Sequence, residues 1–380
     1  MHLKYRGVNQ AFNEMIRGIR SGVIPTVTSP SRNGEVQVVE EPVIVTFQRP
    51  LERVLLNEVR DANPFFHLYE SLWMLAGRND VAPLAYYNGK IKDYSDDGAT
   101  FNGAYGRRWR GTGRLDAFGR GSPDQLEILI SHLKQKPDSR RAVLSIWNVE
   151  DDLHKLDTTK DNACNVCAMF SVELGKCSLC EAKPHLVGSC SKCGGKPHDL
   201  PRYLNMTVCN RSNDLIWGLL GANVVHFSFL QEYMAAHLGL ECGVYNQMTN
   251  NCHVYTWNWK PEEWLKWEDN FDRRDDPYEA DDFKAFPLVS DPATFDRELP
   301  KFVERHSKDA IGGQYNEPFL VLVAQPMMVA FHYYKRKEYD VALQIAGSIV
   351  ATDWKQAATS WIRRRKERKE AKDGVSPGTL

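Results

Sequence analysis

The stretches ACNVCAMFSVEL (residues 163–174) and YLNMTVCNR (residues 203–211) decide the fold that this sequence predicts. Both are rich in β-branched, aromatic and other apolar residues, which is typical of strands buried in a sheet. The residues between them are instead rich in Cys, Gly, Lys and Pro. We therefore predict two strands with an insertion, residues 174–202, between them.

The insertion carries two Cys-x-x-Cys pairs separated by nine residues, formed by Cys177, Cys180, Cys190 and Cys193. Four thiolates with this spacing are a ligand set of structural zinc. An insertion this short cannot bury a core of its own, so the metal would supply its folding energy. We predict a zinc-stapled hairpin tip. Chance cysteines in a loop, a redox pair, or a contact with nucleic acid or a partner are the alternatives.

Patterns further out predict an α/β fold class. Residues 35–49 favour two strands broken at Pro42, and residues 63–78 favour an apolar helix with Asn63 as its N-cap and Pro64 at its first position. We expect further helices at residues 9–19, 124–136, 222–238 and 336–370, and strands at 140–148, 241–257 and 317–334. Residues 26–35 read as a loop, and residues 259–300 as irregular structure.

The composition excludes several classes of protein. The chain has 380 residues, with 48 Lys and Arg against 49 Asp and Glu, so it lacks the surplus of cations that wrapping nucleic acid requires. No apolar run approaches the roughly 20 residues of a membrane span, and the N-terminus shows no signal-peptide core. We expect a soluble, cytoplasmic protein, whose reducing surroundings favour zinc over disulfides.

Three kinds of side chain point to chemistry on a phosphorylated small molecule. Arginine forks match phosphate oxygens, and the candidates are Arg32, Arg140, Arg141 and Arg211. A guanidinium near Cys164 would lower the pKa of its thiol. Glu70 is an acid on an apolar helix, where it needs an internal partner or a proton-transfer role. Solvated surface arginines and a buried structural cysteine are the simpler alternatives.

Seven segments, in order along the chain, resemble the motifs of the thymidylate synthase superfamily. They are FHLYESLWMLAG (66–77), FNGAYGRRWR (101–110), PDSRRAVLSIWN (137–148), ACNVCAMFSV (163–172), CNRSNDLIWG (209–218), ANVVHFSFLQEYMA (222–235) and NCHVY (251–255). The resemblance implies a large mixed, twisted β-sheet with flanking helices. It places a catalytic domain at residues 31–335, after an N-terminal segment (1–30) and before a C-terminal helix and basic tail (336–380).

The resemblance also implies roles for matched residues. Cys164 takes the place of the nucleophile, since choosing it over Cys167 keeps Phe170 and Val172 in register with the family's strand. The other matched residues are Glu70, Tyr105 and Asp214 for catalysis, Arg32, Arg140, Arg141, Arg211 and Ser212 for the phosphate, Asn223 for the base, and His253 and Tyr255 for the ribose. The family's one-carbon donor is 5,10-methylenetetrahydrofolate, and two of its phosphate arginines, here Arg140 and Arg141, cross the interface of a homodimer.

The sequence departs from the family pattern at four places. Asn165 stands where the family has histidine after the nucleophile. The segment IKDYS (91–95) lacks the tryptophan that covers the reactive methylene, and Lys92 and Tyr94 lie roughly where it is expected. The segment from Asp214 to Asn223 is one residue longer than usual, and the usual closing tail is not evident.

These departures bear on which reaction the family's covalent intermediate undergoes. Hydride from the folate gives dTMP, whereas water gives 5-hydroxymethyl-dUMP. The missing tryptophan favours water, hence a dUMP hydroxymethylase, as in a phage that modifies its DNA; the alternatives are thymidylate synthase and dCMP hydroxymethylase. Asn223 favours uracil, because cytosine-reading members usually carry aspartate there. A zinc-knuckle nucleic-acid-binding module, based on RRRKERK (363–369), is the alternative from another class; the intact set Cys164, Glu70 and Arg211 argues against it.

Overall fold

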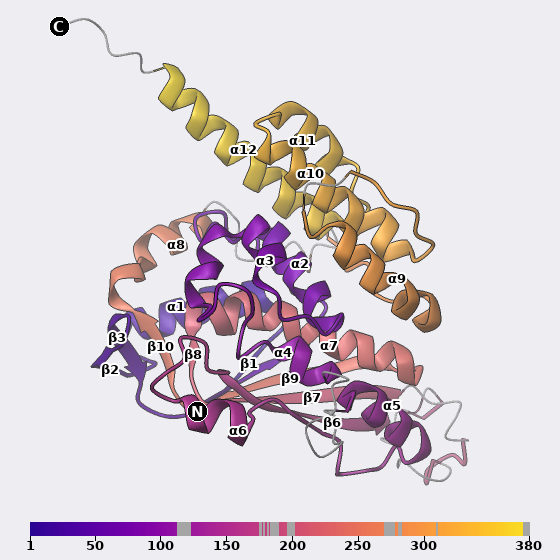
Figure 1. Cartoon of the computed structure of the whole chain (residues 1–380). Helices are drawn as coiled ribbons and strands as arrows, with labels where there is room; N and C mark the ends of the chain where they lie inside the picture. The colour runs from indigo at the N-terminus through magenta and orange to yellow at the C-terminus, as the bar shows by residue number, and fades with distance from the viewer. Residues whose placement is uncertain are drawn as a thin grey trace, which may run out of the picture.

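The computed structural model describes residues 1–111, 123–174, 177, 179, 180, 182, 190–195, 202–269, 278, 279, 283–308 and 311–374. Two β-sheets lie beneath several layers of helices (Figure 1). The larger sheet has the strand order β1 (His2–Tyr5), β4 (Val43–Phe47), β9 (Glu241–Thr249), β7 (Arg202–Asn210), β6 (Asn165–Leu174), β5 (Val143–Ser145). The smaller sheet has the order β2 (Thr26–Ser31), β3 (Gly34–Val39), β10 (Cys252–Tyr255), β8 (Asn213–Asp214).

The larger sheet is mixed, and the two strands predicted around the insertion are confirmed at its centre. β6 and β7 pair antiparallel from Asn165 opposite Asn210 to Leu174 opposite Arg202, so the insertion leaves from one end of the pair. β7 pairs parallel with β9, and β1 pairs parallel with β4. The predicted mixed α/β fold with flanking helices is therefore confirmed.

Alternation along the central strands gives the sheet one helix-covered face and one open face. On β6 and β7 the buried side chains are Ala168, Phe170, Val172, Leu204, Met206 and Val208, and the residues between them are half-buried or exposed. The buried face lies against α7 (Asn223–Leu238), which is buried from Asn223 to Ala235 and lies between the sheet and α2 (Pro64–Leu75) (Figure 1). A helix with no exposed face is one that lies within a core.

Helix α2 begins as its sequence predicts. The side chain of Asn63 accepts a hydrogen bond from the backbone N–H of Phe66 at 3.1 Å, and Pro64 occupies the first helical position. The cap satisfies one of the N–H groups that a helix start leaves free. It fixes where the helix begins, and therefore which of its faces carries Glu70 toward α7.

The other described helices surround this core. They are α1 (Val8–Arg20), α3 (Val81–Tyr87), η1 (Gly89–Tyr94), α4 (Tyr105–Arg110), α5 (Gln125–Gln135), α6 (Val149–Asp152), η2 (Leu153–Lys155), η4 (Leu215–Ala222), η5 (Thr256–Asn258) and α8 (Pro261–Asp269). Of the helices that the structure describes, none combines the length and the apolar composition that crossing a membrane requires.

The C-terminal quarter is helical, which corrects one strand prediction. It contains α9 (Pro292–Arg305), η6 (Leu320–Ala324), α10 (Gln325–Lys335), α11 (Tyr339–Gly347) and α12 (Thr352–Gly374), and packs over α2 on the side away from the sheet (Figure 1). Strands were predicted at 317–334, but Leu320, Val323, Ala324, Met327 and Phe331 are buried at a spacing of three and four residues. That spacing is helical, so this apolar run forms helices rather than strands.

Three other local predictions need correction. The helix predicted at 336–370 is two helices, α11 and α12, separated by residues 348–351. The loop predicted at 26–35 contains β2, which pairs antiparallel with β3 as a hairpin. The irregular stretch 259–300 contains α8 and most of α9. In the last two cases packing against a neighbouring element outweighs the local turn residues.

Candidate active site

The reactive-cysteine candidate lies at the edge of the central hairpin. Cys164 immediately precedes β6 and Arg211 immediately follows β7, so the antiparallel pairing brings the two residues together. The backbone N–H of Arg211 donates to the carbonyl of Cys164 at 2.9 Å, and Nη2 of Arg211 lies 3.9 Å from Sγ. The thiol is half-buried with a guanidinium directly beside it.

The guanidinium of Arg211 is fixed by the backbone around it. Nε donates to the carbonyl of Ala163 at 2.9 Å and Nη2 to the carbonyl of Asn162 at 3.2 Å, while the group lies 5.5 Å from the ring centre of Trp147. Arg32, from the turn between β2 and β3, donates to the carbonyl of Lys160 at 3.1 Å. Both arginines are exposed, so two positive charges face solvent near the cysteine and can bind an anion.

The expectation of a lowered pKa at Cys164 is wrong. Burial raises the pKa of the thiol above its ordinary value, and this outweighs the opposing charges of Arg211 and Arg32. Asp161 raises the pKa further. A thiolate removed from water loses its hydration, and two partly solvated guanidinium groups do not replace it fully.

Alkylation of Cys164 by iodoacetamide should therefore keep accelerating as the pH rises past 8.5, the approximate ordinary pKa of cysteine. Only the thiolate reacts, and the raised pKa moves its formation to higher pH. Arg211→Gln should move the midpoint higher still, because it removes the largest opposing charge. Peptide mass spectrometry follows Cys164 separately from the other cysteines. A wild-type midpoint below the ordinary value would contradict this account.

Tyr105, at the start of α4, lies against the same cysteine. The backbone N–H groups of Cys164 and Asn165 donate to its phenolic oxygen, and burial raises its pKa well above the ordinary value. The hydroxyl group therefore stays protonated at neutral pH and keeps a proton to share. Its position beside the nucleophile candidate agrees with the placement that the sequence predicts.

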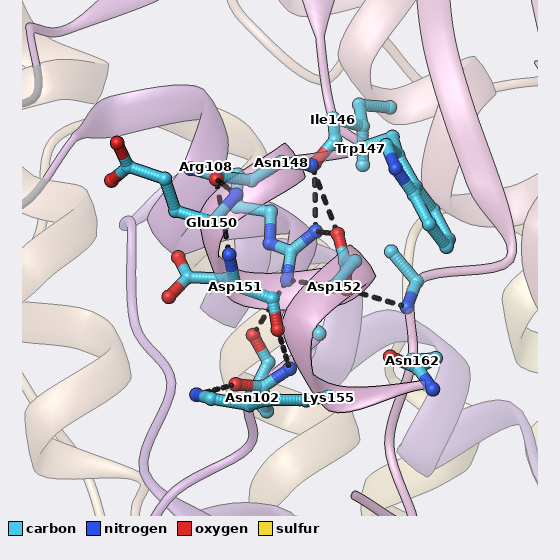
Figure 2. A network of polar contacts seen from close by, with 12 residues as sticks. Asn102, Arg108, Ile146, Trp147, Asn148, Glu150, Asp151, Asp152, Lys155 and Asn162 are labelled. Atoms are coloured by element: carbon cyan, nitrogen blue, oxygen red, sulfur yellow. Dashed lines mark hydrogen bonds and ion pairs between the residues drawn. The ribbon is translucent and has the colours of Figure 1, made fainter. Parts of the chain in front are cut away.

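A buried ion pair supports the loop that carries Cys164 (Figure 2). Arg108 and Asp152 form this pair, and Arg108 also donates to the carbonyls of Ile146 at 2.8 Å and Asn102 at 2.9 Å. Asp152 in turn accepts from the backbone N–H of Ala163, the residue before Cys164, at 3.4 Å. A buried charge needs its partner, so this pair ties α4, β5 and α6 to the backbone beside the cysteine.

Asn213, two residues after Arg211, contacts the base-reading candidate Asn223. Nδ2 of Asn223, at the start of α7, donates to Oδ1 of Asn213 at 3.0 Å. Asp214 caps the following turn through the N–H groups of Ile216 and Trp217. Burial raises the pKa of Asp214, although those two hydrogen bonds and the charge of His253 lower it. His253 is the register partner of Asp214 on β10. Residues 211–214 therefore connect the cysteine to Asn223 and His253.

Glu70 lies across from the first turn of α7. Its carboxylate is 2.9 Å from Nε2 of His226, one turn after Asn223, and both side chains are buried. His67, one turn before Glu70 on α2, has its pKa lowered to about 3, first by burial and then by the charges of His226 and Arg60. His67 is therefore neutral at physiological pH. The internal partner that the sequence required for Glu70 is His226.

The two ribose candidates lie on the smaller sheet. His253 and Tyr255 are neighbours on β10, with ring centres 5.5 Å apart, and Nδ1 of His253 lies 2.9 Å from Oδ1 of Asn251. The hydroxyl of Tyr255 accepts from Asn33, the residue after Arg32, at 3.4 Å. The sheet thus brings these two rings toward the same turn that carries Arg32.

Some predicted site residues are not joined to this cluster within the chain. Arg140 and Arg141 are exposed at the start of β5, and among the described contacts none links them to Cys164, Arg32 or Arg211. Ser212 lies half-buried between Arg211 and Asn213. On η1, Lys92 is exposed and Tyr94 is 49% exposed, so the segment that lacks the tryptophan presents no buried ring.

The four predicted metal ligands converge. The sulfur atoms of Cys177, Cys180, Cys190 and Cys193 all lie within 4.8 Å of one another. The N–H groups of Leu179 and Cys180 donate to the sulfur of Cys177 and lower its pKa, so thiolate character is stabilised there. Four such sulfurs fit a tetrahedral Zn²⁺ with bonds of about 2.3 Å. Cys177 and Cys190 pack in a small cluster separate from the main core.

Sequence reasoning missed three residues that the structure places in the site. Asn213 occupies the variable position of the RSND segment, Arg108 lies within the matched YGRRWR segment, and His226 follows Asn223 by one helical turn. The spacing of three between Asn223 and His226 was the only local signal, since it places both side chains on one helix face. The partners of Asn213 and Arg108 are distant in sequence and gave no such signal.

Comparison with known proteins identifies the family of this chain. The thymidylate synthase family model matches residues 53–274. Deoxyuridylate hydroxymethyltransferase of Pseudomonas phage M6 is 40% identical over 395 aligned positions, which cover 98% of this chain and 99% of the phage protein. Deoxyuridylate hydroxymethyltransferase of Bacillus phage SP01 is 40% identical over 216 positions, 56% of this chain and 49% of that protein. The chain belongs to the thymidylate synthase family.

Proposed function

We propose that this protein is a dUMP hydroxymethylase, which transfers a one-carbon unit from 5,10-methylenetetrahydrofolate to C5 of dUMP and adds water to give 5-hydroxymethyl-dUMP. The observation that carries the proposal is the thiol of Cys164 beside Arg211, with Tyr105 against the same backbone. The family match and the names of both phage relatives support it.

The chemistry begins at the cysteine. C5 of uracil is a poor nucleophile, but addition of the Cys164 thiolate to C6 makes C5 an enolate carbon that attacks the one-carbon unit. Since burial raises the pKa of this thiol, its proton must pass to water before the thiolate adds to C6. Tyr105, whose protonated hydroxyl lies at the cysteine backbone, is placed to hold the water that takes the proton from C5.

The nucleotide is held by groups from four parts of the chain: the β2–β3 turn, the segment after β7, strand β10 and helix α7. Arg32, Arg211 and Ser212 bind the phosphate, and His253 and Tyr255 hold the ribose 3′-hydroxyl. Asn223 offers one donor and one acceptor, which match O4 and N3–H of uracil. Glu70, paired with His226, accepts and donates protons near O4 of the base. Asp214 has a buried Oδ2 atom without a partner among the described residues.

Water rather than hydride completes the reaction because η1 presents no indole over the reactive methylene. Lys92 and Tyr94 are exposed there and cannot shield it as an indole would. Turnover of dUMP with 5,10-methylenetetrahydrofolate should therefore release tetrahydrofolate. Dihydrofolate, detected by its near-ultraviolet absorbance in step with product, would instead make the protein a thymidylate synthase.

A homodimer would complete the phosphate site. The open face of the larger sheet exposes Val143 by 47%, Met169 by 37% and Met248 by 39%, on three different strands. A second copy packed on this face would cover these apolar side chains, and a two-fold axis would give each subunit the same neighbour. Arg140 and Arg141, exposed just before β5, would then reach the phosphate site of the second subunit.

We also propose that the Cys177 group holds one structural Zn²⁺, far from the chemistry. Cys164 precedes β6 and the insertion follows it, so a strand of 10 residues, about 33 Å, separates them. Protein purified without chelator should contain one zinc per chain by elemental analysis. Cys180→Ser with Cys190→Ser should lose the metal and melt at lower temperature, yet still trap 5-fluoro-dUMP in the cold. A metal-free wild type would contradict the assignment.

The binding-module alternative loses its main support in the structure. In the basic run of α12, Arg364, Arg365 and Arg368 pair with Asp61, and Lys366 pairs with Asp340. These cations anchor the helix and are partly neutralised within the chain, which leaves a weak electrostatic surface for nucleic acid.

A free thiol at Cys164 and a thiolate-bound zinc both require a reducing compartment, which supports a cytoplasmic location.

A further inference from the structure

A chain of three buried side-chain amides runs from the larger sheet to the start of α7. Nε2 of Gln247, on β9, donates to the carbonyl of Leu219 at 2.9 Å. Nδ2 of Asn213 donates to Oε1 of Gln247 at 3.2 Å. Nδ2 of Asn223 donates to Oδ1 of Asn213 at 3.0 Å. All three side chains are buried, so water does not substitute for these contacts.

The direction of this chain is fixed by its first member. A side-chain amide can rotate by half a turn and exchange its oxygen and nitrogen, but a backbone carbonyl only accepts. Gln247 must therefore turn its nitrogen to Leu219 and its oxygen to Asn213. Asn213 must then turn its nitrogen to Gln247 and its oxygen to Asn223. Each amide fixes the next, and Asn223 must present Nδ2 to Asn213.

Neighbouring residues leave little freedom for another arrangement. A Cβ atom on Gly218 would lie 2.1 Å from Oδ1 of Asn213 and 3.3 Å from Nδ2 of Asn223, so only glycine leaves room for this pair. The hydroxyl of Tyr245 donates to the backbone carbonyl of Asn223 at 3.5 Å. None of the hydrogen bonds among the described residues uses Oδ1 of Asn223, so that oxygen is available to a ligand.

The orientation of Asn223 decides which base it can read. Uracil presents a donor at N3 and an acceptor at O4, whereas cytosine presents an acceptor at N3 and a donor at the exocyclic amine. An asparagine amide fits either base, but in opposite orientations. An amide free to rotate would therefore accept both nucleotides, and one held in a single orientation would accept only one of them.

We propose that Asn213 and Gln247 are positioning residues that hold the amide of Asn223 in the orientation that reads uracil. The inference rests on the proposed function, since it concerns how that site selects its base. It assigns selectivity to two residues that do not touch the nucleotide. Discrimination against cytosine then depends on this chain of three buried amides, the relay, whose direction is fixed at the carbonyl of Leu219.

Two variants of one residue test the relay in the full-length protein. Gln247→Met has similar size but removes the acceptor that orients Asn213. Gln247→Glu keeps an acceptor, and its carboxyl group, protonated by burial, can still donate to Leu219. The measurement is the ratio of kcat/KM for dUMP to that for dCMP. The ratio should fall about tenfold or more in Gln247→Met, because reversing the amide exchanges two hydrogen bonds, and stay near the wild-type value in Gln247→Glu.

Each outcome separates this inference from the proposed function. If wild type prefers dUMP and Gln247→Met folds with the same preference, the relay is wrong and the function stands. If wild type converts neither nucleotide, the proposed function fails first. Asn213→Ala, which removes the direct neighbour of Asn223, should lower the ratio as Gln247→Met does; an unchanged ratio in this variant also overturns the proposal.

A structure of the wild-type protein with dUMP tests the relay without any variant. At a resolution that distinguishes nitrogen from oxygen, Nε2 of Gln247 must face the carbonyl of Leu219 and Oδ1 of Asn223 must accept from N3 of the base. The opposite orientation of Asn223 in that complex would overturn the proposal even if every variant failed to fold.

Discussion

Replacing Cys164 with alanine is expected to reduce turnover of dUMP by a factor on the order of 10⁴ or more, because the reaction has no route to an activated C5 without a covalent bond at C6. The variant should also fail to form the stable adduct with 5-fluoro-dUMP, seen as a mass increase of the intact protein. Because Cys164 is half-buried at a strand end, alanine should leave the fold and the melting temperature almost unchanged.

Cys167 supplies the matched control. It lies three residues further along, on the open face of the sheet and directly opposite Cys209. Cys167→Ala should retain turnover and adduct formation, because its thiol points away from the face that carries the site. Loss of the adduct in Cys167→Ala, with the adduct retained in Cys164→Ala, would move the nucleophile and overturn the register on which the site is built.

Mixing two inactive chains is expected to restore roughly a quarter of wild-type activity. One chain carries Cys164→Ala, and the other carries Arg140→Ala with Arg141→Ala. Random pairing makes half of the dimers hybrids. Of the two sites in each hybrid, one has both Cys164 from its own subunit and intact arginines from the other subunit. Half of the dimers, each with one intact site out of two, together give one quarter of the wild-type activity.

The result depends on which subunit the arginines serve. If Arg140 and Arg141 acted in their own chain, every hybrid site would lack either the cysteine or the arginines, and mixing would restore nothing. Co-expression of the two chains with different affinity tags isolates the hybrids directly, and their activity should reach half of that of wild type. Restored activity would also establish the dimer that the open sheet face suggests.

Local patterns were sufficient to predict the parts of the fold that local forces decide. The strands of the β6–β7 hairpin follow from their apolar runs, and the start of α2 follows from Asn63 and Pro64. The contact between Cys164 and Arg211 then follows from that hairpin, since the two residues flank its open end. The spacing of the four cysteines in the insertion likewise predicted that they converge.

Other features depend on contacts that no local pattern contains. The helices at residues 320–335 were mistaken for strands because an apolar run has a clear period only once its buried positions are known. The raised pKa of Cys164 reflects burial by distant segments, whereas the sequence shows only the arginines. The relay from Gln247 to Asn223 joins three elements, so no single motif could reveal it.

The most direct test of the account is the mass of the nucleotide formed when the purified protein is incubated with dUMP and 5,10-methylenetetrahydrofolate. Under the proposed function, the exposed η1 segment leaves the reactive methylene open to water, and the predicted product is therefore 5-hydroxymethyl-dUMP. The Cys164→Ala protein, run in parallel, should form no product. Formation of dTMP by the wild-type protein would contradict the hydroxymethylase assignment.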